Sequence, residues 1–200
     1  MAEVSTVAII GAGALGRGIA HLAALSGYRT ILEDLLPSSL RKAEEEFRTS
    51  LDHAISSGLV RSADAPSALA RLEYSASVEE AARNADLVIE AVPEELESKS
   101  EIFILLDKIC RPATILVTTT STLTVAQLAS VTYRADKCVG MRFTRPVWEI
   151  KPLEIVRGLE TSADTLGAAF ALGKKMGKEV ALVADIASTV PELSVQTRSM

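Results

Sequence analysis

The stretch TVAIIGAGALGRGIAHLAALSG, residues 6–27, joins an apolar, β-branched run to a glycine-rich turn and an alanine-rich helical pattern. The run predicts a buried strand, and the alanine-rich part predicts a helix. Between them, Gly11, Gly13 and Gly16 form the pattern GxGxxG. In such a turn the first glycine allows a tight bend, the second lets a pyrophosphate approach the backbone, and the third lets helix and strand pack closely. A purely structural turn is the alternative, because glycine-rich turns are common.

A carboxylate follows this motif where a dinucleotide site requires one. Asp34 lies eighteen residues beyond Gly16, at the end of the second predicted strand, where it would accept hydrogen bonds from ribose hydroxyls. The helix N-terminus would offer N–H groups to phosphates, so Ala14 and Leu15 join the three glycines as candidate cofactor-binding residues. The residues after Asp34 read LLP, with no arginine to accept a 2′-phosphate. The pattern therefore predicts NAD rather than NADP as the cofactor.

Strand-like and helix-like segments alternate along the chain. The expected strands are residues 6–13, 29–34, 85–92, 114–120, 138–143, 153–158 and 179–185. The expected helices are 14–27, 40–58, an apolar stripe over 102–109, a segment starting near 124, and 162–176, with a polar connection between 58 and 85. This alternation predicts an α/β fold, a Rossmann-type, doubly wound, mainly parallel sheet with helices on both faces. Residues 1–185 would form this domain, and 186–200 a tail of uncertain structure.

Composition and charge exclude several classes of protein. The net charge of −5 argues against an extended surface for nucleic acid or anionic membranes. No apolar run approaches the length of a membrane span, and no signal peptide precedes the first strand. Cys110 and Cys138 lie far apart and form no CxxC pattern. We therefore expect a cytoplasmic protein with reduced cysteines and without a metal.

Several stretches together are similar to one protein family: GAGALGRGIA, ADLVIEAVPEELESKSEIF, TSTL, KPLEIVRG and TSADTLGAAFALGKKMGKEV. Over roughly residues 4–185 the chain resembles the N-terminal, NAD-binding domain of the 3-hydroxyacyl-CoA dehydrogenase family. The resemblance implies an oxidoreductase of fatty acid metabolism, which transfers a hydride between NAD and a 3-hydroxyacyl-CoA or a small 3-hydroxy acid. In that family a helical domain follows, forms the dimer and closes the substrate cleft. These 200 residues end where that domain would begin.

The resemblance assigns roles to four polar residues. Glu94 and Lys99 match positions that contact the cofactor near its nicotinamide. Ser121 matches a serine that binds the substrate hydroxyl, and Glu154 matches a glutamate that orients the catalytic histidine. Plainer roles are also open. Lys99 could be solvated, Ser121 could cap the helix starting near Thr124, and Glu154 could be an ordinary polar strand residue.

The catalytic histidine itself is missing. In the family it lies in a segment similar to HFFNP, which here reads RFTRP, so Arg142 replaces the histidine and Arg145 the asparagine. A guanidinium stays protonated at physiological pH and cannot accept the hydroxyl proton. His21 and His53 fall in the first two predicted helices, where we expect ordinary surface or partly packed side chains.

Other departures concern coenzyme A and the end of the chain. Ser56 and Ser57 stand where the family commonly has a lysine, although Ser50 matches a helix serine that can contact CoA. Glu192 stands where the family has an asparagine.

Two functions stay open from the sequence. The first is an NAD-dependent oxidoreductase in which Ser121 holds the substrate hydroxyl. The second is a catalytically degenerate NAD-binding module, or pseudoenzyme, without the proton relay. In both cases the expected partner is a small molecule, an acyl-CoA by the resemblance. The chain would form a homo-oligomer or receive the helical domain from a separate chain.

The replaced histidine also predicts a contact. Glu154 lies twelve residues beyond Arg142, on the next predicted strand. Because a guanidinium can bind a carboxylate bidentately, we expect an Arg142–Glu154 salt bridge in place of the catalytic pair. The alternative is that Arg142 points into solvent.

Overall fold

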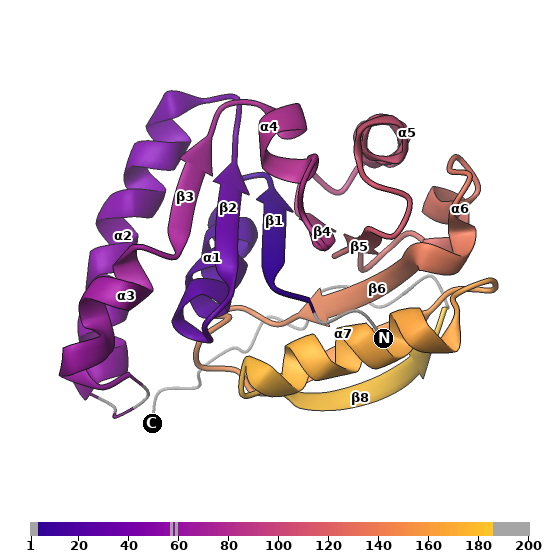
Figure 1. The fold of residues 1–200 in the computed structure, drawn as a ribbon. Coiled ribbons are helices and arrows are strands. Elements are labelled where there is room, and N and C mark those ends of the chain that lie inside the picture. Colours follow the sequence, from indigo (N-terminus) through magenta and orange to yellow (C-terminus); the bar gives the residue numbers. More distant parts are fainter. Residues whose placement is uncertain (1–3, 57, 59, 186–200) are drawn as a thin grey trace, which may run out of the picture.

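A computed structural model describes residues 4–56, 58 and 60–185, which form one eight-stranded sheet between layers of helices (Figure 1). The strands lie in the order β3-β2-β1-β4-β5-β6-β7-β8. They are β1 (Thr6–Ile10), β2 (Arg29–Glu33), β3 (Leu72–Ser75), β4 (Leu87–Glu90), β5 (Ile115–Thr118), β6 (Cys138–Phe143), β7 (Pro152–Arg157) and β8 (Glu179–Ala184).

Helices connect most of these strands. They are α1 (Ala14–Leu25), α2 (Pro37–Ser56), α3 (Ala65–Leu69), α4 (Val78–Ala82), α5 (Leu96–Ile109), α6 (Val125–Ala129) and α7 (Ala163–Lys175), with short 3-10 turns at Ser62–Asp64 and Ala135–Lys137.

The order of the strands positions a crevice. All neighbouring strands are parallel except β6 and β7. The chain starts at β1 inside the sheet, moves outward through β2 and β3, and then returns to the other side of β1 with β4. Open α/β sheets bind ligands at the carboxyl ends of their strands, where the order reverses in this way. The topology therefore predicts the site beside the end of β1, between β2 and β4.

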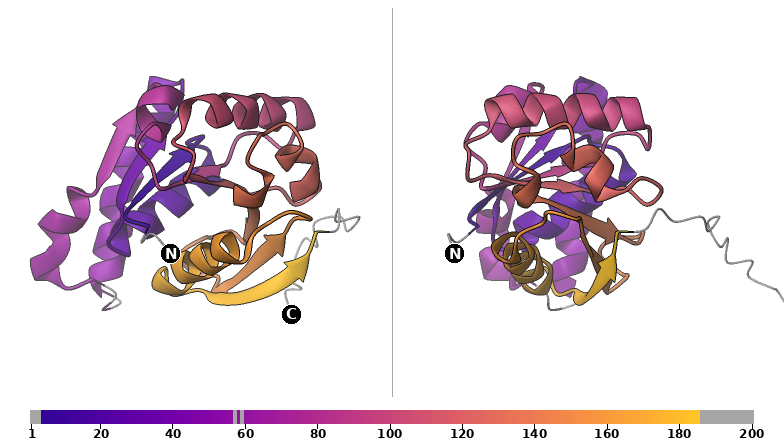
Figure 2. Two further views of the ribbon diagram at one scale, coloured as in Figure 1. Left: turned by 45° about the vertical axis from the view of Figure 1, so that its right-hand side comes forward. Right: turned by 90° about the vertical axis from the view of Figure 1, so that its right-hand side faces the viewer.

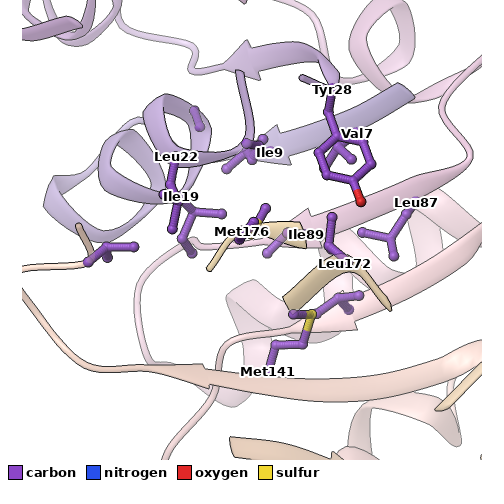
Figure 3. Close-up of a cluster of buried hydrophobic side chains, with 14 of the residues drawn as sticks. Val7, Ile9, Ile19, Leu22, Tyr28, Leu87, Ile89, Met141, Leu172 and Met176 are labelled. Carbon is purple, nitrogen blue, oxygen red and sulfur yellow. The ribbon is translucent and has the colours of Figure 1, made fainter. Parts of the chain in front are cut away.

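Two apolar layers hold the helices to the sheet. One layer packs α1, α2 and α7 against it, and Figure 3 shows Ile19 and Leu22 of α1 beside Ile9 of β1, with Leu172 of α7 nearby. The other layer packs α4, α5 and α6, through residues such as Ala81, Phe103 and Leu128. In the right-hand view of Figure 2, α5 and α7 accordingly lie on opposite sides of the sheet.

The predicted fold class is confirmed, but the predicted connection between residues 58 and 85 is wrong. That segment contains α3, β3 and α4, a strand of four residues and two helices of five. Elements this short are too brief for a hydrophobic period to become visible in the sequence. The predicted tail and Glu192 lie outside the described residues. Within the described ranges, no helix has the length and apolar character that crossing a membrane needs.

Candidate functional site

The glycine-rich turn has the geometry that the motif predicts. Gly11 follows β1 with a φ of 104°, which glycine adopts without strain. A Cβ on Gly16 would lie 1.8 Å from the carbonyl oxygen of Gly11, so the third glycine lets α1 start this close to β1. A Cβ on Gly13 would meet nothing within 4 Å, and Gly13 lines a cleft. The turn therefore leaves open space of the kind that a pyrophosphate needs.

The N-terminus of α1 opens onto this space. Its N-cap residue, Gly13, has no side chain to bind the first N–H groups, and the first turn holds no acidic residue. These N–H groups, together with the positive end of the dipole of a twelve-residue helix, suit phosphate oxygens. Ala14 and Leu15 also line the cleft. The residues of the turn thus fit the pyrophosphate of a dinucleotide.

Asp34 lies next to the turn, just beyond β2. Its Oδ2 accepts a hydrogen bond from the backbone N–H of Ala12 at 2.9 Å, and its Oδ1 accepts one from the N–H of Leu36 at 2.8 Å. These bonds fix the carboxylate at the edge of the cleft. Each carboxylate oxygen can accept more than one hydrogen bond, so Asp34 can still bind ribose hydroxyls.

Glu94 joins the loop after β4 to the loop after β5. Its Oε1 accepts hydrogen bonds from the N–H groups of Ser121 at 2.8 Å and Thr122 at 3.0 Å, and from the hydroxyls of Thr120 and Thr122. Burial alone would raise the pKa of Glu94, but these bonds and the Lys99 ammonium outweigh it and lower the pKa to about 2. Glu94 lines the cleft as a fixed anion rather than as a proton acceptor.

Lys99 lies one layer behind the cleft. Its side chain is 1% exposed, and its Nζ lies 2.7 Å from Glu90 Oε1, 3.2 Å from Glu94 Oε2 and 3.3 Å from the carbonyl oxygen of Val92. Glu90 also accepts a hydrogen bond from the hydroxyl of Thr118 at 2.8 Å. The alternative of a solvated lysine is therefore wrong. Its implied contact with the cofactor stays a prediction, and in this arrangement it would act through Glu94.

Ser121 lies in the exposed loop after β5 and lines the cleft. The cap of α6 is Thr124, whose hydroxyl accepts a hydrogen bond from the N–H of Gln127 at 3.2 Å and forms a capping box with it. The alternative that Ser121 caps this helix is therefore wrong. Its implied role in binding a substrate hydroxyl stays a prediction.

Arg142 and Arg145 line the end of the cleft farthest from β2. Arg142 donates from Nε to the carbonyl oxygen of Thr120 at 3.1 Å, and its Nη1 lies 3.8 Å from Glu154 Oε2. The predicted ion pair across neighbouring strands is thus confirmed, and full exposure of Arg142 is wrong. The bidentate geometry is not found, because 3.8 Å between Nη1 and Oε2 exceeds hydrogen-bond distance.

His21 is more deeply buried than predicted, at 3% exposure between α1 and α2. Its ring nitrogens lie 3.1 Å from Ser50 Oγ and 3.0 Å from the carbonyl oxygen of Ala43. Burial lowers its pKa to about 4. His21 is a neutral core residue outside the cleft lining, and Ser50, the candidate CoA contact, is its partner.

Glu33 is a cleft residue that the motifs did not indicate. It is 2% exposed, its Oε1 has no hydrogen-bond partner, and burial followed by the charge of Asp34 raises its pKa to about 7. Two acids end β2 side by side, and the dinucleotide motif assigns a role to only one of them. The sequence did contain one signal for Glu33 as a site residue, namely a carboxylate at the end of a predicted strand, directly after two apolar residues.

Known proteins match this chain closely. Residues 6–186 match the sequence model of the 3-hydroxyacyl-CoA dehydrogenase NAD-binding domain. The chain is 37% identical over 183 residues to a probable 3-hydroxybutyryl-CoA dehydrogenase of Bacillus subtilis, covering 92% of this chain and 63% of that protein. It is 33% identical over 179 residues to a 3-hydroxyadipyl-CoA dehydrogenase of Escherichia coli, covering 90% and 38%. The crystal structure of the (S)-3-hydroxybutyryl-CoA dehydrogenase PaaH1 of Ralstonia eutropha superposes with a TM-score of 0.87 at 35% identity, covering 94% and 66%.

The strand order, the glycine turn and the acid after β2 define a Rossmann-type dinucleotide-binding domain. The chain belongs to the 3-hydroxyacyl-CoA dehydrogenase family, of which it holds the NAD-binding domain. The predictions of family, fold and cofactor are thereby confirmed. The chain spans 62–63% of the length of the 3-hydroxybutyryl-CoA dehydrogenases of Bacillus subtilis and Bradyrhizobium diazoefficiens.

Proposed function

We propose that this chain binds NAD in the cleft and does not by itself complete the dehydrogenation of a 3-hydroxyacyl-CoA. The observation that carries this proposal is Arg142 at the position of the family's histidine. Removing a hydride from a hydroxyl-bearing carbon also requires removal of the hydroxyl proton, and a guanidinium cannot accept it. Losing a positioned base typically costs a factor of ~10²–10⁴ in rate.

No other cleft residue supplies that base within the described part of the chain. The titratable side chains of the lining are Glu33, Asp34, Glu94, Arg142 and Arg145. Glu33, which ends β2, and Asp34, which follows it, lie on the far side of β1, β4 and β5 from Arg142, and the pKa of Glu94 is lowered to about 2. Glu94, which binds the backbone of Ser121, therefore stays ionised, and Glu33 and Asp34 lie away from Ser121.

The cleft residues support the cofactor assignment. The turn from Gly11 to Gly16 and the start of α1 would hold the pyrophosphate, and Asp34 would hold a ribose. Glu94 would border the nicotinamide, and it also fixes the loop that carries Ser121. When bound, NAD supplies the hydride acceptor or donor.

A second candidate function is slow hydride transfer from a 3-hydroxyacyl-CoA to NAD, or from NADH to the corresponding 3-oxoacyl-CoA. Ser121 favours it, because it lines the cleft where the resemblance implies a contact with the substrate hydroxyl. The relatives' names point to acyl-CoA substrates, and a fatty acid oxidation complex subunit alpha of Acinetobacter baumannii, 33% identical over 182 residues, points to fatty acid metabolism. We further propose that a helical unit, from a separate chain or within a homo-oligomer, covers the open side of the cleft. The buried free thiols of Cys110 and Cys138 support a cytoplasmic location.

One experiment separates these functions. NADH fluorescence is titrated with the chain, and turnover of 3-hydroxybutyryl-CoA with NAD is then measured with and without a helical-domain protein of the family. Gly13→Val should abolish NADH binding, because its side chain would fill the open space over the turn, whereas Ala171→Val on the exposed side of α7 should not. NADH binding without turnover of 3-hydroxybutyryl-CoA supports the NAD-binding module that does not complete the reaction. Ordinary dehydrogenase turnover contradicts it, and absent NADH binding contradicts both functions.

A further inference from the structure

Glu33 is a buried acid whose hydrogen bonds are incomplete. The side chain is 2% exposed and lines the cleft, and Oε1 is enclosed without a hydrogen-bond partner. Buried polar atoms are nearly always paired, because an unpaired one forfeits its hydrogen bonds to water. A ligand that brings a donor to Glu33 would remove this cost.

Strand geometry tells which part of the cleft Glu33 faces. Side chains alternate along a strand, so Glu33 points to the same face of the sheet as Ile31, two residues earlier. Ile31 belongs to the apolar layer of α4, α5 and α6, and so does Ile10, the neighbour of Glu33 in register on β1. Figure 1 shows α4 beside the tips of β1 and β2. Glu33 therefore faces the α4 side of the cleft.

This side of the cleft is apolar. Its walls are Ile10, Val78, Val92 and Ile102, which all line the cleft and pack in the same layer. Within the described part of the chain, Glu33 is the polar side chain that lies beside these four apolar residues. The glycine turn takes a pyrophosphate and Asp34 takes a ribose, so the group that follows along a dinucleotide is the base. A purine has apolar faces and a polar edge, which suits a pocket with apolar walls and one carboxylate.

We propose that Glu33 is a cofactor-binding residue, which accepts a hydrogen bond from the exocyclic amine of the adenine base. This inference rests on the proposed function, since it takes NAD as the occupant of the cleft. An ionised carboxylate only accepts hydrogen bonds. Adenine presents an amine at its C6 position, whereas hypoxanthine presents a carbonyl oxygen there, and that oxygen would face Glu33 as a second acceptor.

The test compares two reduced cofactors, NADH and its hypoxanthine analogue, by fluorescence titration at pH 8. We expect the wild-type chain to bind NADH about ten-fold more tightly than the analogue. Glu33→Met removes the acceptor and should bring the two affinities within about two-fold of each other. Glu33→Gln should also reduce the preference, because an amide can present either its oxygen or its NH₂ group. Glu101→Gln, on the exposed side of α5, should keep the preference unchanged.

Each result of this comparison either supports or overturns the role of Glu33 in binding adenine. Equal wild-type affinities, or a preference that persists in both Glu33 variants, overturn the role of Glu33 while leaving NAD binding intact. Failure of NADH to bind the wild-type chain instead overturns the proposed function. If Glu33→Met does not fold, as thermal unfolding would reveal, Glu33→Gln decides the question, because it preserves the shape of the side chain.

Discussion

Arg142 and Glu154 lie directly opposite each other on the antiparallel strands β6 and β7, with Nη1 3.8 Å from Oε2. The arginine side chain is 17% exposed and the glutamate side chain 50% exposed. A separation of 3.8 Å is an ion pair without hydrogen-bond geometry. The guanidinium also donates from Nε to the carbonyl oxygen of Thr120 at 3.1 Å. A permanent cation thus stands where the family has its proton acceptor.

This geometry predicts a small contribution of the ion pair to stability. Half-exposed pairs contribute roughly 0–1 kcal/mol, because water screens the charges. We therefore expect Glu154→Gln to lower the free energy of unfolding by less than about 1 kcal/mol. Urea denaturation measures it, with Glu179→Gln at the exposed start of β8 as the control. A loss of roughly 3 kcal/mol would indicate instead a pair that behaves as buried.

Cofactor choice should follow from the residues after β2. Asp34 would face a 2′-phosphate with a negative charge, and Leu35 and Leu36 line the neighbouring part of the cleft. The cations of the lining, Arg142 and Arg145, lie at the other end. We expect NAD to bind at least about ten-fold more tightly than NADP, a difference of about 1.4 kcal/mol. Calorimetry with both cofactors measures this ratio, and equal affinities would remove Asp34 from the ribose site.

Restoring the histidine alone should not restore activity. Arg142→His supplies a titratable ring beside Glu154, but Arg145 still replaces the asparagine, and these 200 residues span only 63% of the length of the relative in Bacillus subtilis. We expect turnover of 3-hydroxybutyryl-CoA to stay well below that of an intact relative measured in parallel. Arg142→Gln is the matched control, because it removes the charge without adding a base. A single substitution that reached the relative's rate would show that the rest of the site is complete.

The sequence predicted best where one local pattern determines one structure. The glycine turn, the buried strands and the helix that begins at Ala14 follow from apolar periodicity and from sterics within a few residues. The segment from Ala65 to Ala82 was missed because β3 is an edge strand of four residues between two very short helices. Such elements depend on contacts with the rest of the fold, which a short window cannot reveal.

The site shows the same limit. Asp34 could be predicted from its spacing to the glycines. Its neighbour Glu33 could not, because only the packing of α4 and α5 against the sheet makes that side chain buried and unpaired. Likewise, the sequence left open a solvated lysine at position 99, whereas the fold encloses Lys99 against Glu90. The burial of a charge is a property of tertiary structure.

His21 should make stability depend on pH. Its pKa falls from 6.5 in the unfolded chain to about 4 in the folded protein, chiefly because of burial. The unfolded state therefore binds a proton first as the pH falls, and stability is lost between pH 6.5 and 4. The loss should amount to about 3 kcal/mol relative to His21→Asn, which has no titrating ring. Urea denaturation of both proteins across this range measures it, and parallel pH profiles would contradict the prediction. Glu33 has the opposite effect, because its raised pKa lowers stability as the pH rises from 4.5 to about 7. Both proteins contain Glu33, so its contribution cancels when the free energy of unfolding of one is subtracted from that of the other.

The buried Lys99 should be costly to remove. Its ammonium is the partner of Glu90, which is 0% exposed, so Lys99→Met would leave a carboxylate in the core without its counter-charge. Breaking such a pair from one side typically costs 3–5 kcal/mol, and we expect a loss of that order in urea denaturation. Lys108→Met, on the exposed side of the same helix, should cost far less. Adding Glu90→Gln to Lys99→Met should recover part of the loss, because the amide removes the buried charge, its oxygen can accept from the N–H of Val92, and its NH₂ can donate to the hydroxyl oxygen of Thr118. A double variant no more stable than Lys99→Met would show that the lysine stabilises the core by packing rather than by charge.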